Sequence, residues 1–119
     1  MKISILLPYK ENYSPDYAGA VSIFINAVSK VSKYKKNIRI FGNTDLKKKF
    51  SKNYVNIPLE KKYFKSLTKI YLNNFLKIEN KRKSNIIEVH NRPKYLESLK
   101  NIKNRKFVLY FHNDPLSIS

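Results

Sequence analysis

The stretch Ile3-Ser4-Ile5-Leu6-Leu7, which ends at Pro8, decides the fold class. It is a short, largely apolar run with β-branched residues, and such runs are typical of strands that are buried on both faces of a parallel sheet. Similar runs follow along the chain at residues 37–41, 54–59, 86–89 and 107–111. Pro58 interrupts the run at 54–59, so we expect the weakest strand there.

Segments with helical periodicity separate these runs. Apolar residues recur every three or four positions from residue 20 and again between about residues 61 and 81, which predicts two amphipathic helices. The first helix is expected to pack on the sheet through Ala20, Phe24, Ala27, Val28 and Val31, with Val21 and Ile25 widening this face. The stripe of the second helix is Phe64, Leu67, Tyr71, Phe75 and Ile78, with Lys62, Lys65 and Lys69 outside it. Pro93 opens a short third helix.

The resulting order of elements is β-α-β-(β)-α-β-α-β. Strands that alternate with helices predict an α/β fold, in which helices cover a parallel sheet and the crossovers are right-handed. There is no internal repeat or Gly/Ser linker, so residues 1–119 are predicted to form one Rossmann-like domain. Residues 114–119 follow the last strand without a further helix, which indicates an incomplete domain.

Charge and composition limit the classes of partner. The chain has 25 Lys and Arg against 8 Asp and Glu, a formal charge of +17, which favours nucleic acid or an anionic lipid surface. Only four of the basic residues are Arg, the side chain best suited to bidentate phosphate and base contacts, so nucleic acid is the weaker expectation. Abundant Lys, Asn, Ile, Tyr and Phe also fit AT-rich codons without any binding role.

Composition also bears on location and on metal chemistry. The absence of cysteine excludes disulfides, thiol nucleophiles and cysteine-ligated metals. No apolar run reaches the roughly 18 residues that span a membrane, and the first apolar run is too short for a secretory signal. We therefore expect a cytoplasmic protein, for which the Lys-rich face of the 61–81 helix allows peripheral contact with the inner face of a membrane.

Two histidines follow predicted strands and are the strongest candidates for chemistry. His90 and His112 stand in the matching contexts His-Asn-Arg-Pro and His-Asn-Asp-Pro. The carboxyl ends of parallel strands meet at the edge of a sheet where ligands bind, so the two side chains should lie close together. One such histidine alone is more often structural, but the pair indicates a functional role for at least one. A metal site formed with Asp114 lacks supporting spacing, and no nucleophile elbow accompanies the histidines.

Gly19 lies where the first loop meets the first helix. A backbone without a Cβ and a helix N-terminus together suit a phosphate group, although a simple turn glycine is the alternative. The glycine patterns of dinucleotide-binding and P-loop proteins are absent from the sequence.

Three segments together resemble the N-terminal domain of family 4 glycosyltransferases. They are Met1 to Leu7 followed by Tyr13-Ser14-Pro15-Asp16-Tyr17-Ala18-Gly19-Ala20-Val21, then Ile86-Ile87-Glu88-Val89-His90-Asn91-Arg92-Pro93, and Leu109-Tyr110-Phe111-His112-Asn113-Asp114-Pro115. The resemblance implies the GT-B fold, in which two Rossmann-like domains face a cleft. It also implies transfer of a sugar from a nucleotide-sugar to a glycan or lipid-linked acceptor with retention of configuration.

The same resemblance assigns expected roles to residues. His112 matches the strand-end histidine beside the transferred sugar, and Gly19 with Ala20 matches the loop near the donor phosphates, where many members have two glycines. The residues expected to line the cleft are His90, Asn91, Arg92, Asn113 and Asp114. No metal or cofactor is expected besides the nucleotide-sugar substrate. The family's C-terminal domain is missing from these 119 residues, so we expect no turnover without it or a partner chain. The alternative function is a small basic module that binds nucleic acid or an anionic membrane.

Overall fold

The computed structural model describes residues 1–60 and 66–112 of the chain. Five parallel strands form one sheet in the order β3-β2-β1-β4-β5. The elements are β1 (Ile3–Leu6), α1 (Ala20–Val31), the 3-10 helix η1 (Lys35–Asn37), β2 (Ile38–Gly42), β3 (Tyr54–Asn56), α2 (Leu67–Arg82), β4 (Ile86–His90), α3 (Tyr95–Leu99) and β5 (Lys106–Tyr110). The predicted α/β class and the parallel, Rossmann-like sheet are confirmed.

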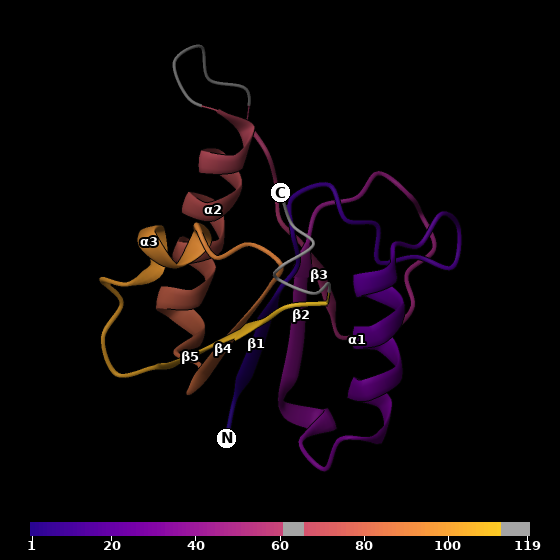
Figure 1. Ribbon diagram of the computed structural model, residues 1–119, viewed down its shortest axis with the longest axis horizontal. Coiled ribbons are helices and arrows are strands. Elements are labelled where there is room, and N and C mark those ends of the chain that lie inside the picture. The colour runs from indigo at the N-terminus through magenta and orange to yellow at the C-terminus, as the bar shows by residue number, and fades with distance from the viewer. Residues whose placement is uncertain (61–65, 113–119) are drawn as a thin grey trace.

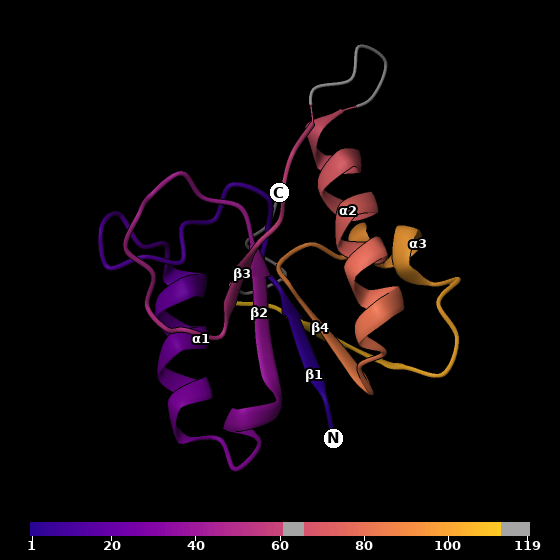
Figure 2. The same ribbon diagram turned by 180° about the vertical axis from the view of Figure 1, so that it is seen from behind.

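The helices lie on both faces of this sheet. Figures 1 and 2 show α1 on one side and α2 with α3 on the other. The central strand β1 is buried along its whole length, with Leu6 in the core beneath α2 and Ile5 in the core beneath α1. None of the helices in the described ranges has the length and apolar character that crossing a bilayer requires. The sheet is therefore a core layer, and its two ends are the surfaces where loops gather.

The predicted buried face of α1 is confirmed for Val21 and Ile25 and wrong for the remaining residues. Phe24, Val28 and Val31 are 41%, 48% and 85% exposed, whereas the buried residues of the helix are Val21, Ser22, Ile25 and Ser29. The hydroxyl of Ser22 donates to a carboxylate oxygen of Glu11 at 2.7 Å and that of Ser29 to the carbonyl of Asn26 at 3.3 Å. Small polar residues with internal partners therefore face the sheet, a solution that a search for apolar stripes does not find.

Helix α2 confirms part of its predicted stripe. Tyr71 and Phe75 are fully buried, but Leu67 is 38% exposed, and Ile70 and Leu72 are buried in addition. The buried face is broad because α2 packs on the sheet and also contacts α3. The helix begins after Ser66, whose hydroxyl accepts from the Lys69 N–H at 3.2 Å. The predicted start at residue 61, with Lys62, Phe64 and Lys65, lies outside the described residues.

A buried carboxylate connects α2 to three other parts of the chain. Glu79 is completely buried and accepts from the Ser4 hydroxyl at 2.9 Å, the Ser84 N–H at 2.9 Å and the Arg105 Nε at 3.3 Å. The Ser84 hydroxyl donates to it as well. An ionised group in the core is tolerated only when its lone pairs are satisfied in this way.

We expect Glu79→Ala to lower the free energy of unfolding by about 3 kcal/mol, because it leaves the Arg105 charge and the serine hydroxyls without their acceptor. Urea denaturation of the purified chain would measure this loss. Glu97→Ala is the matched control, since Glu97 is exposed on α3 and should change stability little. Equal effects of the two substitutions would contradict the role given to Glu79.

Candidate functional site

The structure brings the two histidines together at the carboxyl edge of the sheet. His90 is the last residue of β4, and His112 follows β5 by two residues. The Nδ1 of His90 lies 2.7 Å from the Nε2 of His112, and the two rings stack with centroids 5.0 Å apart. Tyr110 stacks on the His90 ring at the same centroid distance. The expected proximity of the histidines is therefore observed.

Asn91 holds His112 in this position through its backbone and side chain. Its φ of 55° is left-handed, a conformation that asparagine adopts more readily than most residues. The turn lets the Asn91 N–H donate to the Tyr110 carbonyl at 2.8 Å, while Oδ1 accepts from the His112 N–H at 2.7 Å. The chain after β5 is thus attached to the end of β4. Asn91 therefore has a structural task besides any contact with substrate.

Glu88 determines which nitrogen atoms of the pair carry protons. Its Oε2 lies 3.4 Å from the Nε2 of His90, whose ring is almost completely buried. A carboxylate can only accept, so Nε2 of His90 carries a hydrogen, and the Nδ1 of a neutral His90 must then accept. It follows that His112 donates from Nε2 to His90 and keeps the lone pair of its own Nδ1 for another partner.

Burial and charge keep His112 neutral. Desolvation lowers the pKa of its imidazole, the neighbouring His90 lowers it further, and the carboxylate of Glu11 opposes both effects. The ring of Phe24 packs edge-on against His112 with centroids 4.8 Å apart. A neutral imidazole with a free Nδ1 can accept a hydrogen bond from a hydroxyl or take up its proton.

The N-terminus of α1 is occupied by an anion from the chain itself. The carboxylate of Glu11 accepts from the Ser22 N–H at 3.3 Å and from its hydroxyl. Gly19 is the N-cap, and a Cβ there would overlap this carboxylate. The glycine is therefore needed for the close approach of Glu11. Ala20, the first helical residue, is exposed beside it. A phosphate at this helix end would have to displace Glu11.

Arg92 lies at a different cavity from the histidine pair. Its guanidinium donates to the Asn91 carbonyl at 2.8 Å and lines a cavity of about 520 Å³ on the α2 side of the sheet. The other lining residues are Tyr9, Thr68, Leu72, Pro93, Lys94 and Tyr95. Asn113 and Asp114 lie outside the described residues, and so does the metal site that would include Asp114. Within residues 1–60 and 66–112, no three ligating side chains form a metal-binding group.

Sequence reasoning missed Glu88 and Glu11. Glu88 is a carboxylate within the apolar strand Ile86-Ile87-Glu88-Val89, and a charge in such a strand is the signal that could have revealed it. Glu88 also lines a cavity of about 260 Å³ that is separate from the cavity at Arg92. Its other lining residues are His90, Tyr110 and mainly apolar residues of α1, β1 and β2. Glu11 has no comparable signal, because its contact with Ser22 depends on how the loop folds back.

The surroundings of His112 predict how its protonation responds to substitution of its neighbours. The pKa of His112 should lie below 6.5 in a titration of its ring protons by NMR, so acidification through that value should destabilise the fold. Glu11→Gln removes the opposing negative charge and should lower the pKa of His112 further. His90→Gln removes the neighbouring imidazole that lowers the pKa of His112, so this pKa should rise. If neither substitution changed the pKa of His112, the described interactions of His112 with His90 and Glu11 would be contradicted.

Comparisons with known proteins identify no family for this chain. No family model, no curated protein and no solved structure matches this chain. What is shown is an α/β fold with a five-stranded parallel sheet of the Rossmann-like kind and a histidine pair at its carboxyl edge. The function has to be inferred from the chemistry of that edge.

Proposed function

We propose that this chain is the acceptor-side domain of a retaining glycosyltransferase of the GT-B class, similar to family 4. The observation that supports the proposal is the 2.7 Å contact of His112 with His90 at the carboxyl edge, where His112 also packs against Phe24 of α1. Burial and His90 lower the pKa of His112, and its Nδ1 has no partner among the described residues. Open parallel sheets bind their ligands at this edge. A sugar presents hydroxyl groups there, and an acceptor nitrogen in a fixed orientation suits them.

His112 would act on the transferred sugar. As the bond to the leaving nucleotide breaks, positive charge develops on the sugar ring, and fixed dipoles around the ring lower the barrier. The Nδ1 lone pair accepts a hydrogen bond from a sugar hydroxyl without carrying a competing positive charge. Glu88 and His90 would be positioning residues, because the Nδ1 of His90 contacts His112 and Glu88 in turn contacts the Nε2 of His90.

The donor phosphates would use the N-terminus of α1. The free N–H groups and the partial positive charge of a helix start favour a diphosphate, and the Gly19 backbone permits close approach. A diphosphate and the Glu11 carboxylate are both anions, so they compete for the Ser22 N–H. Binding of the donor would therefore release Glu11 from the helix start.

The acceptor would bind near Arg92. The rings of Tyr9 and Tyr95 border its cavity, and aromatic faces suit the apolar faces of sugars, while Arg92 and Lys94 suit a phosphate or carboxylate on a glycan or lipid-linked acceptor. The Tyr95 hydroxyl accepts from the backbone N–H of Tyr9 at 2.9 Å, which fixes the Tyr95 ring against the Tyr9 backbone. A second Rossmann-like domain, on the same polypeptide or a partner chain, would supply the remaining donor contacts.

The donor site is tested by titrating the isotope-labelled chain with nucleotide-sugars and observing amide shifts by NMR. Shifts are expected at Gly19, Ala20 and His112. Glu11→Gln should strengthen donor binding by about fivefold, because it removes the competing charge at the helix start. Glu97→Gln is the control of equal charge and should leave the affinity unchanged. Shifts that avoid the carboxyl edge, or equal effects of both substitutions, would refute the donor site.

The catalytic role of His112 needs the second domain. The 119 residues alone should show no turnover, and joining them to the second half should restore it. In that enzyme His112→Ala should lower kcat by at least about tenfold with little effect on thermal stability. Unchanged turnover would remove His112 from the mechanism, and turnover by the chain alone would refute the need for a second domain.

A further inference from the structure

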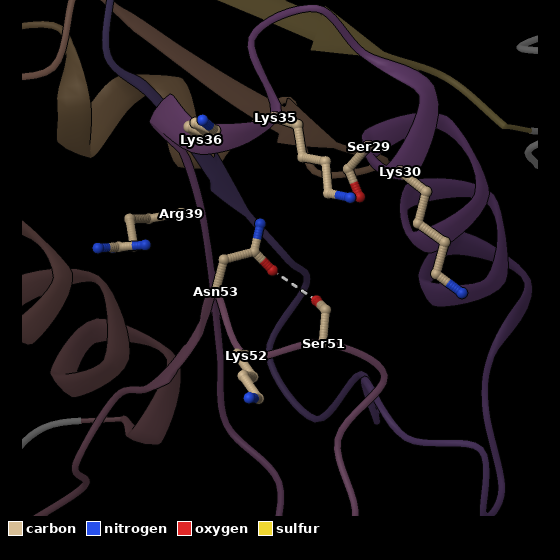
Figure 3. A pocket seen from close by; sticks show the side chains of 8 residues that line it. All are labelled: Ser29, Lys30, Lys35, Lys36, Arg39, Ser51, Lys52 and Asn53. Carbon is tan, nitrogen blue, oxygen red and sulfur yellow. Dashed lines mark hydrogen bonds between the residues drawn. The ribbon is translucent and has the colours of Figure 1, made fainter.

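A basic pocket lies at the opposite end of the sheet from the histidines. It lies between the last turn of α1, η1 and the segment that enters β3, with a volume of about 290 Å³ (Figure 3). The lining residues are Ser29, Lys30, Lys35, Lys36, Arg39, Ser51, Lys52 and Asn53. Five of these carry positive charge and none carries negative charge.

Ser51 and Asn53 form the polar wall of the pocket, and contacts with core residues hold both side chains in place. The Asn53 amide donates to the Ile38 carbonyl at 3.2 Å, and its backbone carbonyl accepts from the Ile40 N–H at 3.0 Å. The Ser51 hydroxyl bonds to the Tyr13 hydroxyl at 2.9 Å and also donates to the Asn53 side chain. Tyr13 is fully buried. The hydroxyl and amide groups thus have fixed positions before any ligand arrives.

Among the described residues, no carboxylate pairs with the cations around this wall. In the described part of the chain Glu79 pairs with Arg105 and Glu88 contacts His90, and neither carboxylate contacts a cation of the pocket. Lys30 alone lies in the last turn of α1, where a cation also offsets the helix dipole. The other cations come from η1, β2 and the loop before β3, so the helix does not explain them.

The arrangement favours a compact anion with several charges. In Figure 3 Lys35 extends into the space between α1 and Asn53, while Lys52 and Arg39 point outward. Lysine has a long flexible stem, so outer cations can turn toward an anion bound at the wall. A single exposed ion pair contributes little in salt, and several simultaneous pairs are required for useful affinity. Two linked phosphates provide these charges within a small volume.

We propose that this pocket binds a diphosphate group, with Lys35 and Lys52 pairing with it from opposite sides and Ser51 and Asn53 forming the wall. The site goes beyond the proposed transferase function and is independent of it, because it lies at the amino ends of β2 and β3. The diphosphate belongs either to a free molecule or to a lipid headgroup.

The first test uses inorganic pyrophosphate at physiological ionic strength, with calorimetry for affinity and NMR for location. Amide shifts are expected at Ser51, Lys52 and Asn53. Lys35→Gln with Lys52→Gln should weaken binding by about tenfold, whereas Lys35→Arg with Lys52→Arg should retain it. Lys77→Gln with Lys100→Gln is the control, since it removes the same charge from exposed positions of α2 and the end of α3.

Equal weakening by the two glutamine variants would overturn the proposal, because it would show attraction to the net charge alone. Shifts at Gly19 and His112 instead of Ser51 and Asn53 would also overturn it and would leave the donor site intact. A second arm uses phosphatidylcholine vesicles with and without a lipid diphosphate. Loss of vesicle binding in the pocket variant only would assign the diphosphate to a lipid headgroup, and binding of free pyrophosphate without vesicle binding would assign it to a soluble molecule.

Discussion

The buried carboxylate of Glu79 is the constraint on which the arrangement of the two histidine-bearing strands depends. It accepts from the Ser84 N–H, two residues before β4 begins, and from Arg105, the residue before β5 begins. Ser4 of β1 donates to the other carboxylate oxygen. One ionised group therefore holds the amino ends of three adjacent strands against α2. Removal of any partner would leave a polar group unsatisfied in the core, which makes the arrangement specific.

The effect of this constraint reaches the carboxyl edge through the register of the strands. Ile86 pairs with Lys106 at one end, and His90 pairs with Tyr110 at the other. With both strands aligned at their starts, equal lengths bring His90 and the residues after Tyr110 to the same level of the sheet. Asn91 then completes the junction by accepting from the His112 N–H. The short distance between the histidines is thus a consequence of packing at the far end.

The two ends of the sheet differ in their electrostatic character. At the carboxyl edge, Glu88 and Glu11 flank a histidine pair whose outer member is kept neutral by burial and by its neighbour. At the amino end, cations surround the pocket between α1 and β3 without a carboxylate among its lining residues. A net charge of +17 does not describe either surface, because it averages over both. The acidic groups are few, and their placement determines where an imidazole or an anion can act.

The sequence by itself determined the class of fold, because apolar strands alternating with helical segments have few compact solutions other than a covered parallel sheet. It also determined that His90 and His112 meet, since each follows a strand and the carboxyl ends of parallel strands share one edge. Only the tertiary structure decided which face of α1 is buried, because Ser22 and Ser29 become acceptable in the core once Glu11 and the helix carbonyls receive their hydroxyl protons. Contacts between residues distant in the chain likewise decided the roles of Glu79 and Glu11, since their partners Ser4, Arg105 and Ser22 reach them only through the fold.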